Sequence, residues 1–292
     1  MKRGKSRRLF KKKKLHSNQR LGCIIAIIVL IPICYGLYLY YQQYSVQHSS
    51  KPQIETSVSL PTPSGKDLEI PVSLIPRQEQ IIRHKGYTVS YNKDLKIPNW
   101  VSYELTRQET KGKEKRGDNF IADPLVKGAI ATNADYARSG YDKGHMAPAA
   151  DMKWSPDVMK ESFYFSNMCP QHPQLNRRGW KNLEEKIRDW AVADSAIIII
   201  CGPIIDKPSK TIGKNKVPVP ERFFKVILSP FVKPARGIGF LFNNRQAVEP
   251  LSTYAVSIDS IEKLTHMDFF SPLPDEIENA VEANADYYQW PR

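Results

Sequence analysis

Residues 133–152, NADYARSGYDKGHMAPAADM, and residues 162–184, SFYFSNMCPQHPQLNRRGWKNLE, decide the fold that we predict for this chain. Taken one at a time, their polar residues have simple explanations. A single histidine in a polar segment, such as His145, is usually a surface or core residue. Asn176 precedes a helical pattern and is most simply a helix cap. Asn167 suits a turn and Glu184 a solvated helix face, so the information lies in their order and spacing.

The chain around these segments mixes strands and helices without strict alternation. Alternating apolar and polar residues predict strands over 87–91 and 100–106. The β-branched run AIIIIC at 196–201 predicts a buried central strand, and 223–228 and 237–242 predict two more. Apolar residues at helical spacing predict an amphipathic helix over 177–192, and weaker patterns predict helices over 258–267 and 275–285. The predicted class is α+β.

Three blocks within the two segments together resemble the DNA/RNA non-specific endonuclease family, an endonuclease G-like group. The family's Asp-Arg-Gly-His motif corresponds to DKGH at 142–145, and its Ser-Asn-x-x-Pro-Gln motif to SNMCPQ at 166–171. Its Leu-Asn-x-x-x-Trp-x-x-Leu-Glu helix corresponds to LNRRGWKNLE at 175–184. The resemblance covers residues 86–274. It implies a ββα-metal (His-Me finger) nuclease domain with a central mixed or antiparallel sheet.

This resemblance implies metal-dependent hydrolysis of phosphodiester bonds in DNA and RNA. His145 is expected to act as the general base, because a neutral imidazole can take a proton from water. Asn176 is expected to hold Mg²⁺, with Mn²⁺ as an alternative. On one continuous α-helix, Glu184 would lie within about 80° of Asn176 and about 12 Å farther along the axis. Glu184 is therefore expected to reach the same ion through water.

Three further residues are expected to support catalysis. By the resemblance, Asn167 orients the site or the scissile phosphate. Lys143 replaces the motif's arginine, and it keeps the charge but loses the planar bidentate fork. Arg116 is the nearest counterpart of an upstream phosphate-binding arginine. The resemblance also implies that Asp142 and Gly144 shape the hairpin around His145. A basic rim is expected beside the metal, formed by Arg177, Arg178 and Lys181.

The net charge of the chain is concentrated at its start. The 43 Lys and Arg residues exceed the 30 Asp and Glu residues by 13, and ten of the basic residues lie within residues 2–20, which contain no acidic residue. The remainder of the chain carries only +3. Net charge alone is therefore no argument for nucleic-acid binding by the rest of the chain.

An uncharged stretch at 21–41, LGCIIAIIVLIPICYGLYLYY, follows the basic tail. As a helix it spans about 31 Å, which is enough to cross a bilayer. Tyrosines at its end resemble an interfacial belt, and the positive-inside rule places residues 1–20 in the cytoplasm. The prediction is a single N-terminal transmembrane helix and an extracytoplasmic nuclease domain. A bacterial inner membrane and periplasm is favoured, and the mitochondrial inner membrane is the alternative. A cleaved signal peptide is the rival interpretation of the stretch.

Residues 42–80 are rich in Ser, Thr, Pro and Gln, which predicts a flexible tether before an endonuclease domain at 81–292. That domain has two cysteines, Cys169 and Cys201, which are either bridged or two buried thiols. Cys169 and His172 have a spacing found in metal sites, but no second close pair completes a zinc site.

Three functions share these residues. The first is a membrane-anchored nuclease acting on DNA and RNA, with the lipid bilayer as a further partner through residues 21–41. The second is a catalytically inactive nucleic-acid-binding module at the membrane, and the third is a phosphodiesterase acting on a smaller substrate. The presence of His145, Asn176 and Glu184 argues against the inactive module. Whether the domain forms a homodimer stays open.

Overall fold

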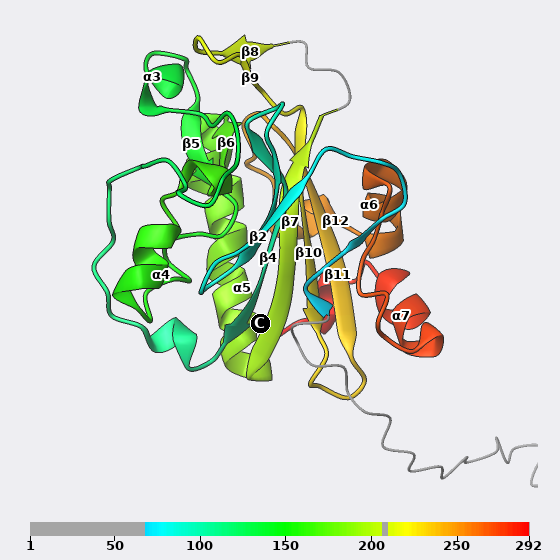
Figure 1. Ribbon diagram of the computed structural model, residues 1–292. Coiled ribbons are helices and arrows are strands. Elements are labelled where there is room, and N and C mark those ends of the chain that lie inside the picture. The colour runs from blue at the N-terminus through cyan, green and yellow to red at the C-terminus, as the bar shows by residue number, and fades with distance from the viewer. Residues whose placement is uncertain (1–67, 206–209, 292) are drawn as a thin grey trace, which may run out of the picture. The chain divides into compact units, whose positions relative to one another are not determined.

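A seven-stranded antiparallel sheet organises the part of the chain that the computed structural model describes, residues 68–205 and 210–291 (Figure 1). Every pairing in this sheet is antiparallel, so the expected central sheet is confirmed in its antiparallel form. In spatial order the strands are β12 (Ala255–Val256), β11 (Arg236–Asn243), β10 (Arg222–Ser229), β7 (Ala196–Ile204), β4 (Ile97–Thr106), β3 (Thr88–Asn92) and β2 (Gln80–Arg83).

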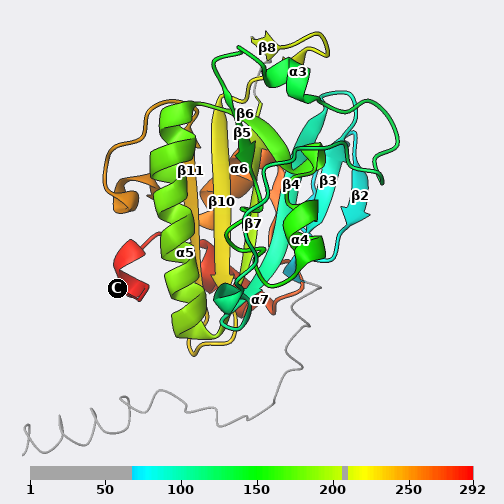
Figure 2. The ribbon, with the colours of Figure 1, turned by 90° about the vertical axis from the view of Figure 1, so that its left-hand side faces the viewer.

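The central strand β7 is buried on both faces, as its uninterrupted apolar run predicts. Ile197 and Ile199 belong to one core and Ile198 and Ile200 to the other, because successive side chains of a strand point to opposite faces. Helices cover both faces of the sheet (Figures 1 and 2). An antiparallel strand therefore carries the continuous hydrophobic sequence that is more common in parallel sheets.

Helix α5 (Trp180–Asp194) lies along one face of the sheet (Figure 2). Its buried residues include Trp180, Leu183, Ile187 and Trp190, which confirms the predicted amphipathic helix. A π-helical turn, η3 (Leu175–Gly179), precedes it. Between β4 and η3 the chain forms η1 (Glu109–Lys111), α3 (Asn133–Tyr136), β5 (Asp142–His145), α4 (Pro156–Glu161), η2 (Phe165–Asn167) and β6 (Met168–Gln171).

Helices α6 (Ile258–Thr265) and α7 (Asp275–Glu282) cover the opposite face of the sheet (Figure 1). They confirm the helices predicted over 258–267 and 275–285. Two short strands, β1 (Val72–Ser73) and β13 (Met267–Asp268), pair beside them. Leu68 is fully buried in this second core. The fold therefore includes residues 68–80, which the sequence pattern placed in the tether. The remaining elements are β8 (Thr211–Ile212), β9 (Val217–Pro218), η4 (Leu251–Tyr254) and η5 (Tyr287–Gln289).

The predicted basic tail and membrane span, residues 1–20 and 21–41, lie outside the described residues. Within the described ranges, no helix has both the length and the hydropathy that a bilayer crossing requires. Cys169 and Cys201 are both buried free thiols, which decides between the two states that the sequence left open.

Candidate active site

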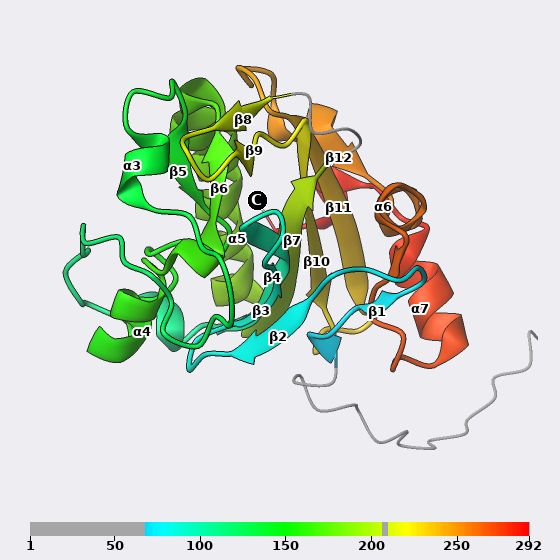
Figure 3. The same ribbon diagram turned by 45° about the horizontal axis from the view of Figure 1, so that its top comes forward.

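Strands β5 and β6 place His145 beside the start of α5. They pair in antiparallel register, with Asp142 opposite Gln171 and His145 opposite Met168. Residues 146–167, which include α4, connect the two strands. Gly144 is required here because a side chain at this position would collide with Gln171. The order β5, β6, α5 is the ββα arrangement that the motifs implied (Figure 3).

A cavity of about 530 Å³ opens between this strand pair and the first turns of α5. Five of the six catalytic or metal-binding residues predicted from the sequence line it: Arg116, Lys143, His145, Asn176 and Glu184. The sixth, Asn167, does not. The other residues that line the cavity are Pro148, Ala149, Ala150, Arg177, Lys181, Glu185 and Arg188.

The imidazole of His145 is 8% exposed and stands against two aromatic rings. Its ring centroid lies 5.0 Å from that of Phe163 and 5.6 Å from that of Phe120. Burial lowers the pKa of His145 to about 3, and the nearby Arg116 guanidinium contributes to the shift. No group within the described residues hydrogen-bonds to its Nε2. The imidazole is therefore neutral near pH 7 and has a nitrogen without a protein partner.

Asn176 is oriented by a carboxylate from the strand pair. Its Nδ2 donates to Oδ2 of Asp142 at 2.9 Å, and Arg177 binds both oxygens of the same carboxylate at 2.8 Å. The amide carbonyl Oδ1 of Asn176 accepts no hydrogen bond from any other described residue, and the side chain lines the cavity. Asp142 thus holds the amide through its nitrogen and leaves the oxygen free for a ligand.

Glu184 is a half-buried carboxylate in the cavity wall. Burial raises its pKa to about 7, against the lowering influence of Lys225 and Arg188, and Asp151 adds to the rise. Arg188 is itself held at 2.8 Å by Asp151, which is almost fully buried. Glu184 is therefore a carboxylate whose charge depends on nearby cations.

Asn167 is fully buried and hydrogen-bonds to backbone rather than facing the cavity. Its Oδ1 accepts from the backbone N–H of Ala147 at 2.8 Å. Its Nδ2 donates to the carbonyl oxygens of Ala147 at 2.8 Å and Ser162 at 2.9 Å. The side chain fixes the backbone immediately after His145, which is the site-orienting half of its expected role, and it is not positioned to touch a phosphate.

Lys143 and Arg116 are cations without a carboxylate partner among the described residues. The Lys143 ammonium lies 4.4 Å from the ring centroid of Phe120 and donates to Asn133 at 3.1 Å. The Arg116 guanidinium lies 5.6 Å from the ring centroid of Phe163. Aromatic faces thus hold both cations at the cavity and leave their hydrogen-bonding capacity largely unused.

A second hollow of about 400 Å³ continues the cavity, because Lys143, Asn176 and Arg177 line both. The rim was expected to contain three basic residues. Arg177 and Lys181 line the first cavity, paired with Asp142 and Glu185, whereas Arg178 is exposed and lines neither hollow. The two hollows adjoin, and five lysines and arginines line them against three carboxylates.

Sequence reasoning missed several residues around the cavity. Arg188 follows Glu184 by one helical turn, so helix periodicity alone places both on one face of α5. Lys225 interrupts the apolar strand FFKVIL, and its fully buried ammonium lies 4.4 Å from the ring centroid of Trp180. Asp151, Phe120 and Phe163 gave no local signal.

The geometry expected between Asn176 and Glu184 is also corrected. The predicted rotation and distance assumed one continuous α-helix. Asn176 instead lies in the π-helical turn η3, which has more residues per turn than an α-helix. Rotation and rise between the two residues therefore differ from the α-helical values. Both side chains nonetheless line the same cavity.

The oxygen donors at this cavity suit a hard divalent cation. The free amide oxygen of Asn176 and the Glu184 carboxylate are the ligand types that Mg²⁺ takes, and few protein ligands are needed because Mg²⁺ retains several waters. The observation that supports the fit is the amide oxygen of Asn176, which has no partner while its nitrogen is fixed by Asp142.

Comparisons with known proteins identify the family of this chain. The model of the DNA/RNA non-specific endonuclease family matches residues 64–276. A nuclease of Nostoc sp. is 30% identical over 80% of this chain and 88% of its own length. Human mitochondrial endonuclease G is 33% identical over 67% of this chain and 71% of its own length.

The solved structures include a related fold. A crystal structure of an EndoG/EndoGI complex, described as showing the mechanism of EndoG inhibition, superposes with a TM-score of 0.63 and 29% identity. The match covers 68% of this chain and 89% of the solved one. The family model spans most of the described fold, including every residue of the cavity, and the chain therefore belongs to the DNA/RNA non-specific endonuclease family.

Proposed function

We propose that the chain hydrolyses phosphodiester bonds of DNA and RNA, with His145 as the general base. The observation that carries the proposal is a neutral imidazole that lines the same cavity as a free amide oxygen and a carboxylate. His145 takes a proton from the attacking water, a step that a neutral imidazole performs and an imidazolium does not. Burial and Arg116, by lowering its pKa, keep His145 in the competent state.

Asn176 and Glu184 are the residues that would hold the divalent cation, Mg²⁺ or alternatively Mn²⁺. The family is one of metal-dependent nucleases. When bound, the cation supplies Lewis acidity at the phosphate and charge stabilisation at the leaving oxygen. Asp142 keeps the amide oxygen of Asn176 directed to the cavity by fixing its nitrogen. Asn167 fixes the backbone that carries His145.

The unpaired cations of the wall bind the phosphate backbone. Arg116 and Lys143 face the cavity without a carboxylate partner in the described ranges, and Arg188 lies in the same wall. Contacts to phosphate carry no sequence information, so a cavity of this kind binds nucleic acid irrespective of base sequence. The cavity adjoins the second hollow, which gives room for the strand on either side of the scissile phosphate.

The test is plasmid and RNA cleavage by the purified full chain in detergent with Mg²⁺. His145→Ala is expected to lower the rate by about 100- to 10,000-fold, the usual contribution of a general base. His172→Ala is the matched control, because its imidazole makes only a local bond to the backbone N–H of Gln174. Full activity in His145→Ala would exclude the mechanism.

The same assay separates the alternative functions. A catalytically inactive nucleic-acid-binding module predicts salt-dependent binding and no cleavage with any divalent metal. A phosphodiesterase of small substrates predicts turnover of a nucleotide diester and none of plasmid or RNA. Cleavage of both polymers by the wild-type chain would exclude both alternatives.

We further propose that residues 21–41 anchor the enzyme in a membrane with the nuclease domain on the extracytoplasmic side. The support is sequence alone: an uncharged span of bilayer length after a tail with ten positive charges. A bacterial inner membrane is favoured, and the mitochondrial inner membrane is the alternative.

A further inference from the structure

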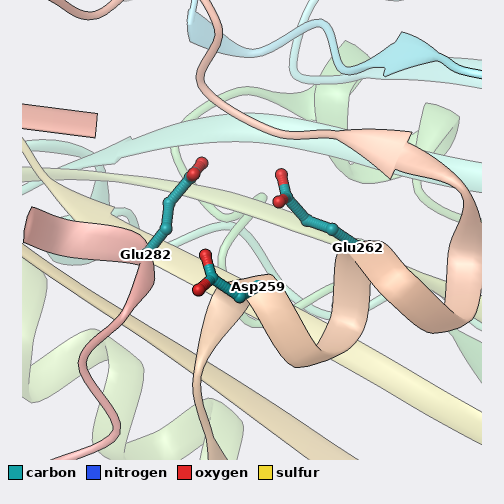
Figure 4. A group of neighbouring side chains, drawn as sticks. All are labelled: Asp259, Glu262 and Glu282. Carbon is teal, nitrogen blue, oxygen red and sulfur yellow. The ribbon is translucent and has the colours of Figure 1, made fainter. Parts of the chain in front are cut away.

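The face of the sheet opposite the active site carries a cluster of five carboxylates. Asp259 and Glu262 come from α6, Asp268 from β13, and Glu278 and Glu282 from α7. Ligand oxygens of Asp259, Glu262 and Glu282 all lie within 4.8 Å of one another, and the same holds for Asp268, Glu278 and Glu282. Figure 4 shows the carboxylates of the first triad facing a common space. Glu282 belongs to both triads.

Glu282 is the residue that the protein itself leaves unsatisfied. It is 6% exposed, and its Oε1 is buried without any hydrogen-bond partner among the described residues. It is also the last residue of α7, where the helix dipole disfavours a negative charge. A buried carboxylate without a partner is costly, so the position calls for a counter-charge that the fold does not supply.

Basic side chains do not provide this counter-charge. Within residues 68–205 and 210–291, no lysine or arginine forms an ion pair with any of the five carboxylates. Lys263 is the only basic residue of α6, and its effect on Glu262 is smaller than that of burial. Glu262 accepts one bond, from the backbone N–H of Phe269 at 2.8 Å.

We propose that this cluster is a Ca²⁺ site, with Asp259, Glu262 and Glu282 as ligands and Asp268 and Glu278 as supporting charges. Two oxygens that contact one Ca²⁺ at about 2.4 Å lie at most about 4.8 Å apart, and the ligand oxygens of the triad lie within this limit. An all-carboxylate set on two helices and a strand suits the larger, less rigid coordination of Ca²⁺ better than that of Mg²⁺.

The site adds a link between elements that already share the second core. Ile258 and Ile261 of α6 and Val281 of α7 belong to the second core, and the five carboxylates border that core. A cation shared by α6 and α7 cross-links the layer that covers this face of the sheet. Its effect is therefore on stability, and it is separate from the catalytic cation, which binds on the opposite face.

The test is isothermal titration of the full chain in detergent with CaCl₂, in excess Mg²⁺ so that the active site is filled. One binding event is expected, with a rise in melting temperature on Ca²⁺ addition. Glu282→Gln is expected to weaken this binding by at least about tenfold and to abolish the temperature rise. Glu276→Gln, an exposed residue of the same helix, is the matched control and retains both.

A second variant separates this site from the active site. Asn176→Ala is expected to keep Ca²⁺ binding and lose cleavage. Glu262→Gln replaces Glu282→Gln if circular dichroism shows that the latter fails to fold. The proposal is overturned if the wild-type chain binds no Ca²⁺ at millimolar concentration, or if Glu282→Gln binds it like the wild type. It is also overturned if Asn176→Ala removes the binding event.

Discussion

Asp142 connects the two halves of the active site. Its carboxylate lies on β5 and accepts hydrogen bonds from Asn176 and Arg177 of the π-helical turn. Asn176 is therefore held in position by its hydrogen bond to Asp142 as well as by the backbone of the helical turn. The first motif contributes this residue as well as His145.

Replacement of Asp142 by alanine should raise the Mg²⁺ concentration needed for half-maximal cleavage. The amide of Asn176 loses its anchor and Arg177 loses its partner, so metal affinity or activity should fall by about 10- to 100-fold. The measurement is a Mg²⁺ titration of plasmid cleavage. Asp157→Ala is the control, since Asp157 forms only an exposed pair with Lys85. An unchanged titration in Asp142→Ala would show that Asn176 needs no such anchor.

The sequence predicted the residues proposed for catalysis better than those that surround them. Spacing and motif order pointed to His145, Asn176 and Glu184, which all line one cavity. The burial of Asn167 was not visible, because an asparagine that binds backbone and one that binds phosphate have the same local sequence. Lys225 stood out in an apolar strand, but only the packing of β10 on α5 places it near Glu184.

At the scale of elements, the π-helical turn η3 determines the direction in which Asn176 points relative to the side chains of α5. Such turns are commonly explained as one extra residue within an α-helix. Arg178 is exposed and lines neither hollow. One extra residue in this turn would change the direction in which Asn176 points. The side chain of Arg178 would not be needed for this effect.

Deletion of Arg178 should convert η3 into a regular α-helical turn and rotate Asn176 away from Asp142. Cleavage is expected to fall by about 100-fold or more, because small misplacements of catalytic groups have effects of this size. Circular dichroism should show a helix content close to that of the wild type. Arg178→Ala is the matched control and should stay active. Retained activity in the deletion variant would show that the phase of η3 is unimportant.

Asp123 joins the β2 end of the sheet to η2, which precedes β6. This buried carboxylate lies 2.9 Å from Nε2 of His84 and accepts bonds from Ser166 at 2.6 Å and from the backbone N–H of Leu125 at 2.9 Å. Burial raises its pKa, but the bonds from His84 and Ser166 outweigh burial, so the folded pKa lies below the ordinary value of 3.8. The ionised form therefore stabilises the fold.

Asp123→Asn should lower the free energy of unfolding at neutral pH by about 2 kcal/mol, because one of the two buried acceptor oxygens becomes an amide donor. The contribution of Asp123 is complete above the unfolded value of 3.8 and is lost as the pH falls through the lower folded value. The difference between wild type and variant should therefore shrink only below about pH 4. Urea unfolding across this range measures it, and a difference independent of pH would contradict the assignment.

The longer elements were predictable because a single physical pattern specifies each of them. The apolar run of β7 and the helical stripe of α5 are sustained over enough residues to decide their type. Short elements such as α3 and α4 have no such pattern, and contacts with the rest of the fold hold them. Residues 68–80 have no local pattern, so the sequence placed them in the tether. Leu68 and the strand pair β1–β13 are instead stabilised by contacts with the α6–α7 layer, which is distant in the sequence.

For the whole molecule, the basic tail should determine orientation in the membrane. Protease added to intact spheroplasts of an expressing bacterium should remove the nuclease domain, as followed by immunoblot. Replacing the ten basic residues of 2–20 by glutamine should abolish the uniform orientation. A cytoplasmic protein is the control for intact cells. Protection of the domain in the wild-type chain would refute the proposed topology.

Groups of charged side chains of opposite sign lie over the two faces of the sheet. Unpaired Arg116 and Lys143 lie over one face and the carboxylates around Glu282 over the other, with two apolar cores between them. While the acidic cluster holds no Ca²⁺, these two groups contribute an electric dipole across the sheet. A long polyanion is repelled from one side and attracted to the other, so it rotates the unit into a productive orientation before contact. Higher ionic strength should weaken this orienting torque and so slow the capture of substrate. This effect is expected although residues 21–292 carry a net charge of only +3.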